Sequence, residues 1–292
     1  MPFQGDIMSM PIQTIGVLGS GQMGIGIAQT AAQVGLEVLL ADISLELAEK
    51  GKAKIAGQLK RFVEKGKMTE EDSQKLLVLI RPLRGIPDLK PAQLVIEAAS
   101  EKPELKYELF KQLDAHCAPS TILATNTSSI SITAIAAQTN RPELVVGMHF
   151  MNPVPVMKLV EGIRGLQTSD QTFNLVRGVA ENMGKTVIEA KDMPGFAVNR
   201  ILIPMINEAV TALHEGVASV EDIDAAMKLG TNQPMGPLTL ADFIGLDTCL
   251  AIMNVLHEGI GDPKYRPNPL LKQYVAAGWL GKKTGRGFYK YE

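Results

Sequence analysis

Short apolar runs alternate with stretches of helical periodicity along the first two thirds of the chain. Such runs, apolar at consecutive positions, are typical of strands buried on both faces of a parallel sheet. The stretches between them carry apolar residues at helical spacing. This order predicts an α/β fold with a mainly parallel sheet. The expected strands are Thr14–Leu18, Glu37–Ala41, Leu94–Ala98, Thr121–Thr125, Val145–Phe150, a second run that ends on Glu161, and Thr186–Ala190.

The strand patterns stop at Asp192-Met193-Pro194-Gly195, and only helical periodicity follows. We therefore predict two domains, an α/β domain over residues 14–193 and an all-α domain over residues 194–292. Pro204 should kink the first helix of the second domain. The expected helices there are Phe196–His214, Val220–Leu229, Leu238–His257 as one helix or a broken pair, and Pro269–Ala277.

The helical domain carries apolar residues that have two explanations. A domain of this kind commonly closes a cleft or forms a dimer. We expect a homodimer through this domain, although a private core explains the same residues equally well. The residues in question are Met205, Ile206, Ile244, Leu246 and Leu250.

The first expected strand runs directly into Gly19-Ser20-Gly21-Gln22-Met23-Gly24, and a helix follows. Asp42 stands at the end of the second strand, at a distance typical of dinucleotide-binding folds. In that motif the glycines permit a tight turn, the approach of a pyrophosphate and close packing of helix on strand. The helix N-terminus offers unpaired N–H groups to the phosphates. The pattern predicts a Rossmann-type domain that binds its cofactor through Gly19, Gly21, Gln22, Met23, Gly24 and Asp42.

Asp42 also bears on which dinucleotide binds. Its carboxylate should accept hydrogen bonds from the adenosine ribose hydroxyls, and it would repel a 2′-phosphate. The residues that follow, Ile43, Ser44 and Leu45, provide no arginine for that phosphate. We expect NAD rather than NADP, unless a basic residue reaches the ribose from elsewhere in the fold.

A helical pair over residues 44–80 interrupts the regular alternation. Ser44 caps a helix that continues to about Lys65, and a second helix starts near Thr69 with acidic residues in its first turn. The pair is either a solvated face or a surface that meets the phosphates of a long substrate. The basic residues that would do so are Lys60, Arg61, Lys65 and Lys67.

Four polar residues follow the carboxyl ends of expected strands: Glu101, Asn126, Ser128 and His149. Ligands bind at this edge of a parallel sheet. Each residue alone has a simpler explanation, and Ser128 in particular can start the helix beyond it. Their convergence on one rim favours a binding site.

His149 and Glu161 are the expected centre of that site. His149 ends an apolar run and Glu161 lies in the next one, after a turn in which Pro153 and Pro155 forbid a helix. Both are polar groups at the edge of an apolar environment, where each needs a partner. We predict that they pair with each other. Alone, they would be an ordinary hydrogen-bonded histidine and a solvated carboxylate at strand ends.

Composition narrows the remaining possibilities. The formal net charge of −2, without a run of Lys and Arg, argues against nucleic acid as a partner. Cys117 and Cys249 match no metal-ligand spacing and are expected to be buried thiols in a reducing cytosol. No segment reaches the ~20 apolar residues that span a bilayer. We expect residues 1–13 to be a disordered extension of a soluble, cytoplasmic protein.

Taken together, these motifs resemble the 3-hydroxyacyl-CoA dehydrogenase family, in particular its bacterial 3-hydroxybutyryl-CoA dehydrogenases. The resemblance covers nearly the whole chain, from about Ile12 to Tyr291, and several motifs in this order are highly specific. The segments that carry it are Gly-Ser-Gly-Gln-Met-Gly (19–24), Asn-Thr-Ser-Ser (126–129), His-Phe-Met-Asn-Pro (149–153), Lys-Leu-Val-Glu (158–161), Pro-Gly-Phe-Ala-Val-Asn-Arg (194–200), Asp-Phe-Ile-Gly-Leu-Asp (242–247) and Gly-Arg-Gly-Phe-Tyr (285–289).

The resemblance implies a reversible, NAD-dependent oxidation of a short-chain (S)-3-hydroxyacyl-CoA to a 3-oxoacyl-CoA, without a metal. It implies that His149 is the catalytic base and that Glu161 orients it. The chemistry fits independently, because a neutral imidazole suits transfer of the alcohol proton while the nicotinamide takes the hydride. Ser128 and Asn199 are implied to contact the reacting oxygen; without the resemblance, Asn199 is a solvated asparagine.

Other implied contacts lie around this centre. Asn152 is implied to line the same pocket on the cofactor side, and Lys65 to meet the CoA phosphates. The chain departs from the pattern at Gln58, where some relatives place a hydroxyl residue against CoA, and at Met151, where phenylalanine is frequent. The remaining cofactor-side contacts implied are Glu101, Lys106 and Asn126.

Two alternative functions compete with this hypothesis. A β-hydroxyacid dehydrogenase of the 6-phosphogluconate type shares the two-domain plan, but its mechanism resembles one based on a lysine. The presence of His149 and Glu161 argues against that mechanism here. The second alternative is a protein without enzymatic activity: a catalytically silent relative, such as lens λ-crystallin, or a nucleotide-sensing structural protein. The intact set of His149, Glu161, Ser128 and Asn199 argues against it.

Overall fold

The computed structural model describes residues 12–291 of the chain. The chain divides after Asp192, next to the predicted boundary, into two compact units. Residues 1–11 of the predicted extension lie outside the described range. Ile12 is buried, and the Gln13 N–H group donates to Gln93 Oε1 over 2.8 Å, so these two residues belong to the packed first unit.

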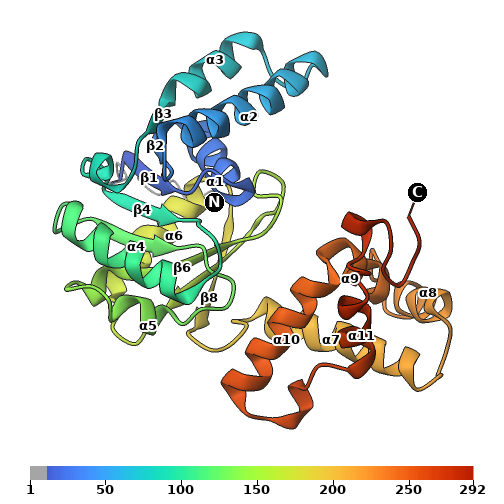
Figure 1. Ribbon diagram of the computed structural model, residues 1–292. Coiled ribbons are helices and arrows are strands. Elements are labelled where there is room, and N and C mark those ends of the chain that lie inside the picture. The colour runs from blue at the N-terminus through green and yellow to red at the C-terminus, as the bar shows by residue number, and fades with distance from the viewer. Residues whose placement is uncertain (1–11, 292) are drawn as a thin grey trace, which may run out of the picture. The chain divides into compact units, whose positions relative to one another are not determined.

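The described part of the first unit contains one eight-stranded sheet in the order β3-β2-β1-β4-β5-β6-β7-β8. Strands β1 to β6 are parallel, β7 is antiparallel to β6, and β8 is parallel to β7. The expected fold class, a Rossmann-type sheet followed by a helical domain, is confirmed (Figure 1). The strands are β1 Thr14–Leu18, β2 Glu37–Ala41, β3 Ile80–Leu83, β4 Leu94–Glu97, β5 Ile122–Thr125, β6 Val145–Phe150, β7 Leu159–Arg164 and β8 Thr186–Lys191.

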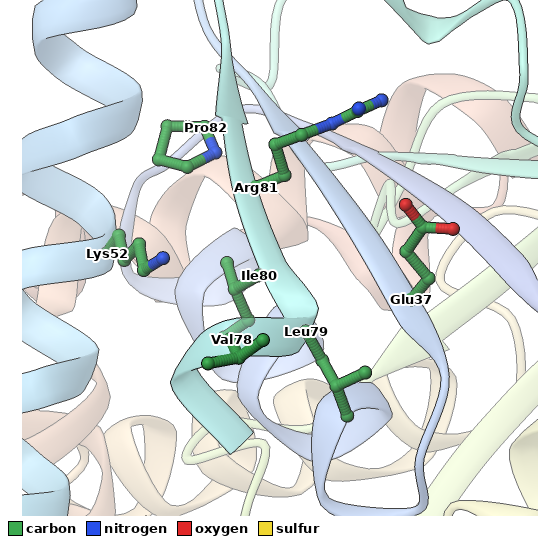
Figure 2. A pocket seen from close by; sticks show the side chains of 7 residues that line it. All are labelled: Glu37, Lys52, Val78, Leu79, Ile80, Arg81 and Pro82. Carbon is green, nitrogen blue, oxygen red and sulfur yellow. The ribbon is translucent and has the colours of Figure 1, made fainter. Parts of the chain in front are cut away.

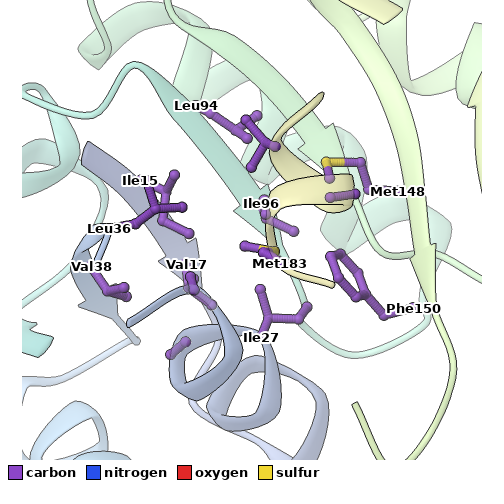
Figure 3. Packing of buried hydrophobic residues seen from close by; sticks show 14 of the residues in the cluster. Ile15, Val17, Ile27, Leu36, Val38, Leu94, Ile96, Met148, Phe150 and Met183 are labelled. Carbon is purple, nitrogen blue, oxygen red and sulfur yellow. The ribbon is translucent and has the colours of Figure 1, made fainter. Parts of the chain in front are cut away.

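Both faces of the sheet are buried, which explains why its strands are apolar at consecutive positions. One face packs on α1 and α6, and Figure 3 shows Ile27, Phe150 and Met183 meeting in this cluster. Strand residues that point to the other face, such as Leu39 and Leu123, are also fully buried. The helices of this unit are α1 Gln22–Gln33, α2 Leu45–Glu64, α3 Glu70–Leu79, α4 Pro103–His116, α5 Ile132–Ala136 and α6 Asp170–Asn182.

The helical pair of residues 44–80 is the connection between two neighbouring strands. Ser44 and Thr69 cap α2 and α3 as predicted, each accepting a backbone N–H bond from the first turn. After α3 the chain enters β3, which pairs in parallel with β2. The sequence pattern misses this strand because Arg81 and Pro82 interrupt it. Proline is tolerated there because β3 is an edge strand.

The long elements of the second unit are all α-helices. Pro204 lies inside α7, and the predicted Leu238–His257 segment is a broken pair, bent by 98° at Gly245, where φ is +103°. No single helix in the described range has the length and apolarity to cross a membrane; α9 and α10 meet that measure only when this bent pair is counted together. The helices are α7 Val198–His214, α8 Val220–Gly230, α9 Pro237–Ile244, α10 Leu246–Ile260 and α11 Pro269–Ala276.

The apolar residues for which a partner subunit and a private core compete are divided by the structure. Ile206 and Leu246 are fully buried in the unit's own core, and Ile244 and Leu250 pack against it. The private core therefore explains these four residues, whereas Met205 is partly buried and is not among the residues of that core. Large apolar side chains elsewhere on the unit are exposed: Ile201, Val217, Leu229 and Phe243.

Candidate active site

The glycine-rich loop between β1 and α1 has the geometry of a phosphate cradle. Gly19 has φ of +106°, and a Cβ atom on Gly24 would lie 1.8 Å from the Gly19 carbonyl oxygen. A Cβ atom on Gly21 would meet nothing within 4 Å, so the space in front of the loop is open. Gly21 caps α1 without a side-chain hydrogen bond, which leaves the first N–H groups of the helix for an anion. The residues present fit a dinucleotide pyrophosphate.

Asp42 lies beside this loop at the carboxyl end of β2. Its Oδ2 atom accepts hydrogen bonds from the Ser20 backbone N–H group over 2.6 Å and from the Ser20 hydroxyl over 2.5 Å. The Ile43 N–H group donates to Oδ1 over 2.8 Å. The carboxylate is therefore fixed against the loop, next to the position that a ribose occupies in this motif.

His149 and Glu161 form a direct pair. The antiparallel register places them opposite each other on β6 and β7, and His149 Nδ1 lies 2.7 Å from Glu161 Oε2. Glu161 is fully buried and His149 is 9% exposed. Met148 and Phe150 point into the core cluster, so His149 points to the opposite face of the sheet. Gly147 shares that face, where a Cβ atom would meet Ile132 of α5.

The loop that leads from β5 to α5 is held by Glu101. Glu101 Oε1 accepts bonds from the backbone N–H groups of Ser128 and Ser129 over 2.8 and 3.1 Å. It also accepts from the hydroxyls of Thr127, Ser128 and Ser129. Burial alone would raise the pKa of Glu101, but the ammonium of Lys106 and these hydrogen bonds outweigh it and lower the pKa. Glu101 is thus held as a carboxylate against this loop.

Two amides connect this rim to neighbouring elements. The side-chain oxygen of Asn126 accepts the Phe150 backbone N–H over 2.9 Å, which joins the carboxyl ends of β5 and β6. Gln22, in the first turn of α1, donates through Nε2 to Asn152 Oδ1 over 3.0 Å. The segment after His149 is thereby attached to the start of α1, next to the glycine-rich loop.

Lys106 lies in the interior, 1% exposed, rather than at the open side of the glycine-rich loop. Its Nζ atom donates to both carboxylate oxygens of Glu97 over 2.7 and 2.9 Å. It also lies 3.4 Å from Glu101 Oε2. Of the residues predicted with it on the cofactor side, Lys106 therefore contacts Glu101.

Lys65 and Asn199 belong to other elements, the end of α2 and the start of α7. Lys65 is exposed and caps the C-terminal end of α2, with Lys60, Arg61 and Lys67 exposed around it. Asn199 lies in the first turn of α7 in the second unit and is partly buried. The predicted approach of Asn199 to the reacting oxygen stays a prediction.

Sequence reasoning missed three charged residues that support the rim. Besides Glu97, Lys185 is buried and donates to the carbonyl oxygens of Val154 and Met157, which holds the proline-rich turn after His149. Asp192 caps the start of α5 by accepting bonds from the Ile132 and Thr133 N–H groups. A buried acid inside an apolar strand was a usable signal for Glu97. The sequence contains no such signal for Lys185 and Asp192, because their partners are backbone groups distant in sequence.

A hollow of about 420 Å³ lies elsewhere, at the edge strand β3. Figure 2 shows its lining, with Glu37 at the start of β2 and Lys52, Arg81 and Pro82 around it. It lies toward the end of β2 opposite to Asp42, so it is not part of the rim. Within residues 12–291, no group of three or more His, Cys, Asp or Glu side chains has a metal-binding arrangement.

Both cysteines are free and buried in their own units. Burial raises the pKa of Cys117 to about 11 and that of Cys249 to about 12. They stay protonated at neutral pH, as expected for structural thiols.

Comparison with known families identifies the family of this chain. The family model described as the 3-hydroxyacyl-CoA dehydrogenase NAD binding domain matches residues 14–193, and that of the C-terminal domain of the same family matches residues 195–291. The chain belongs to the 3-hydroxyacyl-CoA dehydrogenase family. Its first unit is therefore the NAD-binding domain of an NAD-dependent dehydrogenase, and the 6-phosphogluconate type is not needed to explain the fold.

Individual relatives agree over the full length. The "Probable 3-hydroxybutyryl-CoA dehydrogenase" of Bacillus subtilis is 59% identical over 97% of this chain and 99% of that protein. The 3-hydroxybutyryl-CoA dehydrogenase of Bradyrhizobium diazoefficiens is 56% identical over 97% of each chain. The crystal structure of (S)-3-hydroxybutyryl-CoA dehydrogenase PaaH1 from Ralstonia eutropha matches with a TM-score of 0.94 and 54% identity, over 96% of this chain and 99% of that one.

Proposed function

We propose that this chain oxidises (S)-3-hydroxybutyryl-CoA to acetoacetyl-CoA with NAD, reversibly, and that His149 is the general base. The observation that carries the proposal is the buried His149–Glu161 pair, which stands on the same rim of the sheet as the phosphate cradle. Relatives at 50–59% identity that carry the name 3-hydroxybutyryl-CoA dehydrogenase support the short acyl chain.

His149 exchanges the alcohol proton. A carboxylate accepts hydrogen bonds, so the Nδ1 atom that faces Glu161 carries the ring's proton, and Nε2 carries the lone pair that takes the proton of the substrate hydroxyl. Glu161 then stabilises the imidazolium that forms, as an acid does in other histidine-base sites. General-base catalysis of this type contributes roughly 10²- to 10⁴-fold. In the reverse direction the imidazolium returns the proton to the oxygen.

Ser128 and Asn199 hold the reacting oxygen where charge develops. Donors placed in this way stabilise a transition state because they need no reorientation during the reaction. The hydrogen bonds from Ser128 and its neighbours to Glu101 support this role, because they fix the loop that presents the hydroxyl. NAD, when bound, accepts the hydride from the substrate carbon.

The cofactor-side contacts surround this centre. Asp42 holds the adenosine ribose, and Asn126 and Asn152 line the nicotinamide side, each held by a bond to a neighbouring element. Lys65 meets the CoA phosphates at the end of α2, where four exposed cations gather. A compact ammonium suits such a contact, because it acts as a point charge on a phosphate.

The decisive experiment follows NADH absorbance with acetoacetyl-CoA as substrate. Rapid loss of NADH, slower loss with a long-chain 3-oxoacyl-CoA and slower loss with NADPH would support the proposal. Absence of turnover with every acyl-CoA, in protein that still binds NADH, would contradict it and favour a silent relative. Faster turnover with the long chain would reject the short-chain assignment alone.

Replacing Asp42 with Ala is expected to weaken NADH binding and to shift preference toward NADPH by about tenfold or more, because the ribose acceptor and the charge that repels a 2′-phosphate are both removed. Asp42→Asn is the matched control, since its amide oxygen still accepts the Ser20 N–H group, while the charge and the acceptor for the Ile43 N–H group are lost. It should retain the loop and still relax the preference. Dissociation constants from NADH and NADPH fluorescence measure both. Unchanged selectivity in both variants would show that discrimination lies elsewhere.

We also propose that the chain forms a homodimer through its helical unit. The exposed apolar side chains of Ile201, Leu229 and Phe243 support this, because they stand on three successive helices of that unit. Phe243→Asp is expected to shift the particle from two chains toward one in light scattering after size-exclusion chromatography. Leu166→Asp, at a more exposed apolar position in the first unit, should leave the mass unchanged. A monomeric wild-type protein would reject the dimer.

A further inference from the structure

Lys185 is a buried cation that binds backbone oxygens instead of an acid. Lys106 and Arg141, which are also buried in the first unit, each form an ion pair with a carboxylate. The Lys185 ammonium donates to the carbonyl oxygens of Val154 over 2.5 Å and Met157 over 2.9 Å. Burial lowers the pKa of Lys185, because it penalises the charged form. Since burying a cation is costly, the turn that it holds is the place to look for its role.

The end of α6 and the reversal of β7 bring Lys185 to the rim. Gly184 has φ of +75° and donates its N–H group to Glu181, while the Lys185 N–H group donates to Ala180. This pair of bonds is a Schellman motif, which ends a helix and redirects the chain. Because β7 is antiparallel to β6, and β8 is parallel to β7, β8 starts at the edge where β6 ends. Lys185 therefore stands at the edge of the sheet that carries His149.

The turn between β6 and β7, residues 151–158, is poor in backbone donors. Pro153 and Pro155 have no N–H group. Two later N–H groups of the turn, those of Val156 and Met157, both donate to the Pro153 carbonyl oxygen. The buried ammonium adds donors where the proline-rich sequence removes them, so it fixes a turn that has few bonds of its own.

The opposite side of the turn rests on α1. Val154 is 2% exposed, and a Cβ atom on Gly26 would lie 2.9 Å from the Val154 Cβ atom. In the same turn, Asn152 is exposed, and its Oδ1 atom accepts the bond from Gln22. This bond leaves the Nδ2 group of Asn152 to donate to a ligand. The turn is thus clamped between α1 and Lys185, and it presents Asn152 at the rim.

We propose that Lys185 is a positioning residue: its ammonium sets the place of the turn that carries Asn152, and it acts on the nicotinamide side of the cofactor through Asn152. The part that concerns the nicotinamide rests on the proposed function. Lys185 exchanges no proton or electron with the substrate. A hydrogen bond weakens steeply as its distance and angle depart from the optimum, so a small shift of the turn is enough to weaken the contact.

Lys185→Met tests the proposal in the full chain. Methionine keeps a flexible side chain and leaves the two carbonyl oxygens without their donor. We expect a lower melting temperature, and an NADH dissociation constant about tenfold higher. The dissociation constant of ADP should stay within about threefold, because ADP fills the phosphate cradle and the ribose site but lacks the nicotinamide. Calorimetric titration measures both. Equal losses of NADH and ADP affinity would indicate a merely structural role and overturn the proposal, as would wild-type NADH affinity.

Asn152→Ala and the double variant Asn152→Ala/Lys185→Met separate positioning from a direct contact between Lys185 and the cofactor. If Lys185 acts through Asn152, its replacement should cost less than about threefold in NADH affinity once Asn152 is gone. Losses that multiply in the double variant would show that the ammonium contacts the cofactor itself. That result would overturn the proposal.

Thr168→Val is the matched control for stability. Thr168 is buried, and its hydroxyl donates over 2.6 Å to the carbonyl oxygen of Val145, at the opposite end of β6. Valine keeps the shape of the side chain and removes this bond. The variant should melt at a lower temperature and bind NADH and ADP within about threefold of wild type. A selective loss of NADH affinity in this control would overturn the proposal.

Gly26→Ala covers failure of Lys185→Met to fold. The added Cβ atom presses on Val154 from the side of α1, so it displaces the turn while Lys185 is intact. A loss of NADH affinity of about tenfold with unchanged ADP affinity supports the proposal. Wild-type NADH affinity, or an equal loss for ADP, overturns it. Both ligands bind without an acyl-CoA, so failure of the proposed substrate would appear separately, in turnover by the wild-type enzyme.

Discussion

His149→Gln is expected to lower turnover of acetoacetyl-CoA by about three orders of magnitude. Glutamine keeps a polar side chain of similar reach at the end of β6, but it cannot donate or take a proton at neutral pH. The expected loss corresponds to the contribution of a positioned general acid or base. NADH affinity should stay within a few-fold, because the phosphate cradle and Asp42 are separate from His149. Steady-state kinetics and NADH fluorescence measure the two quantities.

His116→Gln is the matched control for this substitution. His116 lies in the last turn of α4, is exposed and contacts the Gln112 carbonyl of its own helix. Its replacement should leave turnover unchanged. Near-wild-type turnover in His149→Gln would remove His149 as the base, and a matching loss of NADH affinity would show that the variant disturbs the fold instead of the chemistry.

Gly24→Ala is expected to abolish NADH binding or weaken it by about a hundredfold or more. The added Cβ atom would lie 1.8 Å from the Gly19 carbonyl oxygen and 2.9 Å from its carbonyl carbon. Both are backbone atoms of the cradle, so no flexible side chain can move away to make room. The turn must open or α1 must shift, and either change displaces the N–H groups that face the pyrophosphate. Titration of NADH fluorescence measures the loss.

Gly57→Ala is the control for a glycine in a helix without such contacts. Gly57 lies inside α2, where a Cβ atom would meet nothing within 4 Å. The change should stabilise the protein by up to about 1 kcal/mol and leave NADH affinity unaffected. Wild-type NADH affinity in Gly24→Ala would show that the cradle tolerates a shift and that close packing of α1 on β1 is not required.

Local patterns predict most of the first unit. Its inner strands are apolar at consecutive positions because both faces are covered, and Ser44 and Thr69 mark helix starts through a local hydrogen bond. β3 escapes prediction, since an edge strand needs no continuous apolar run and accepts Pro82. The choice between one helix and two around Gly245 is likewise not local, because glycine is compatible with both.

In the candidate site, too, the sequence predicts some residues and not others. The glycine spacing, Asp42 and the His149–Glu161 pair are recognisable from residue type and position, since strand ends converge on one edge of a parallel sheet. The supporting residues are not. Lys106 is a lysine on an amphipathic helix until the fold buries it against Glu97, and Lys185 finds its acceptors in a turn that the chain left some thirty residues earlier.

The sequence by itself determines the fold class, the cofactor loop and the identity of the rim residues, because these depend on local spacing and on the fixed directions of parallel strands. Only the tertiary structure decides which charges are buried, which partners they take and how the helical pair connects β2 to β3. Burial and long-range pairing depend on segments far apart in the chain, and a buried charge acquires its role from the groups packed around it.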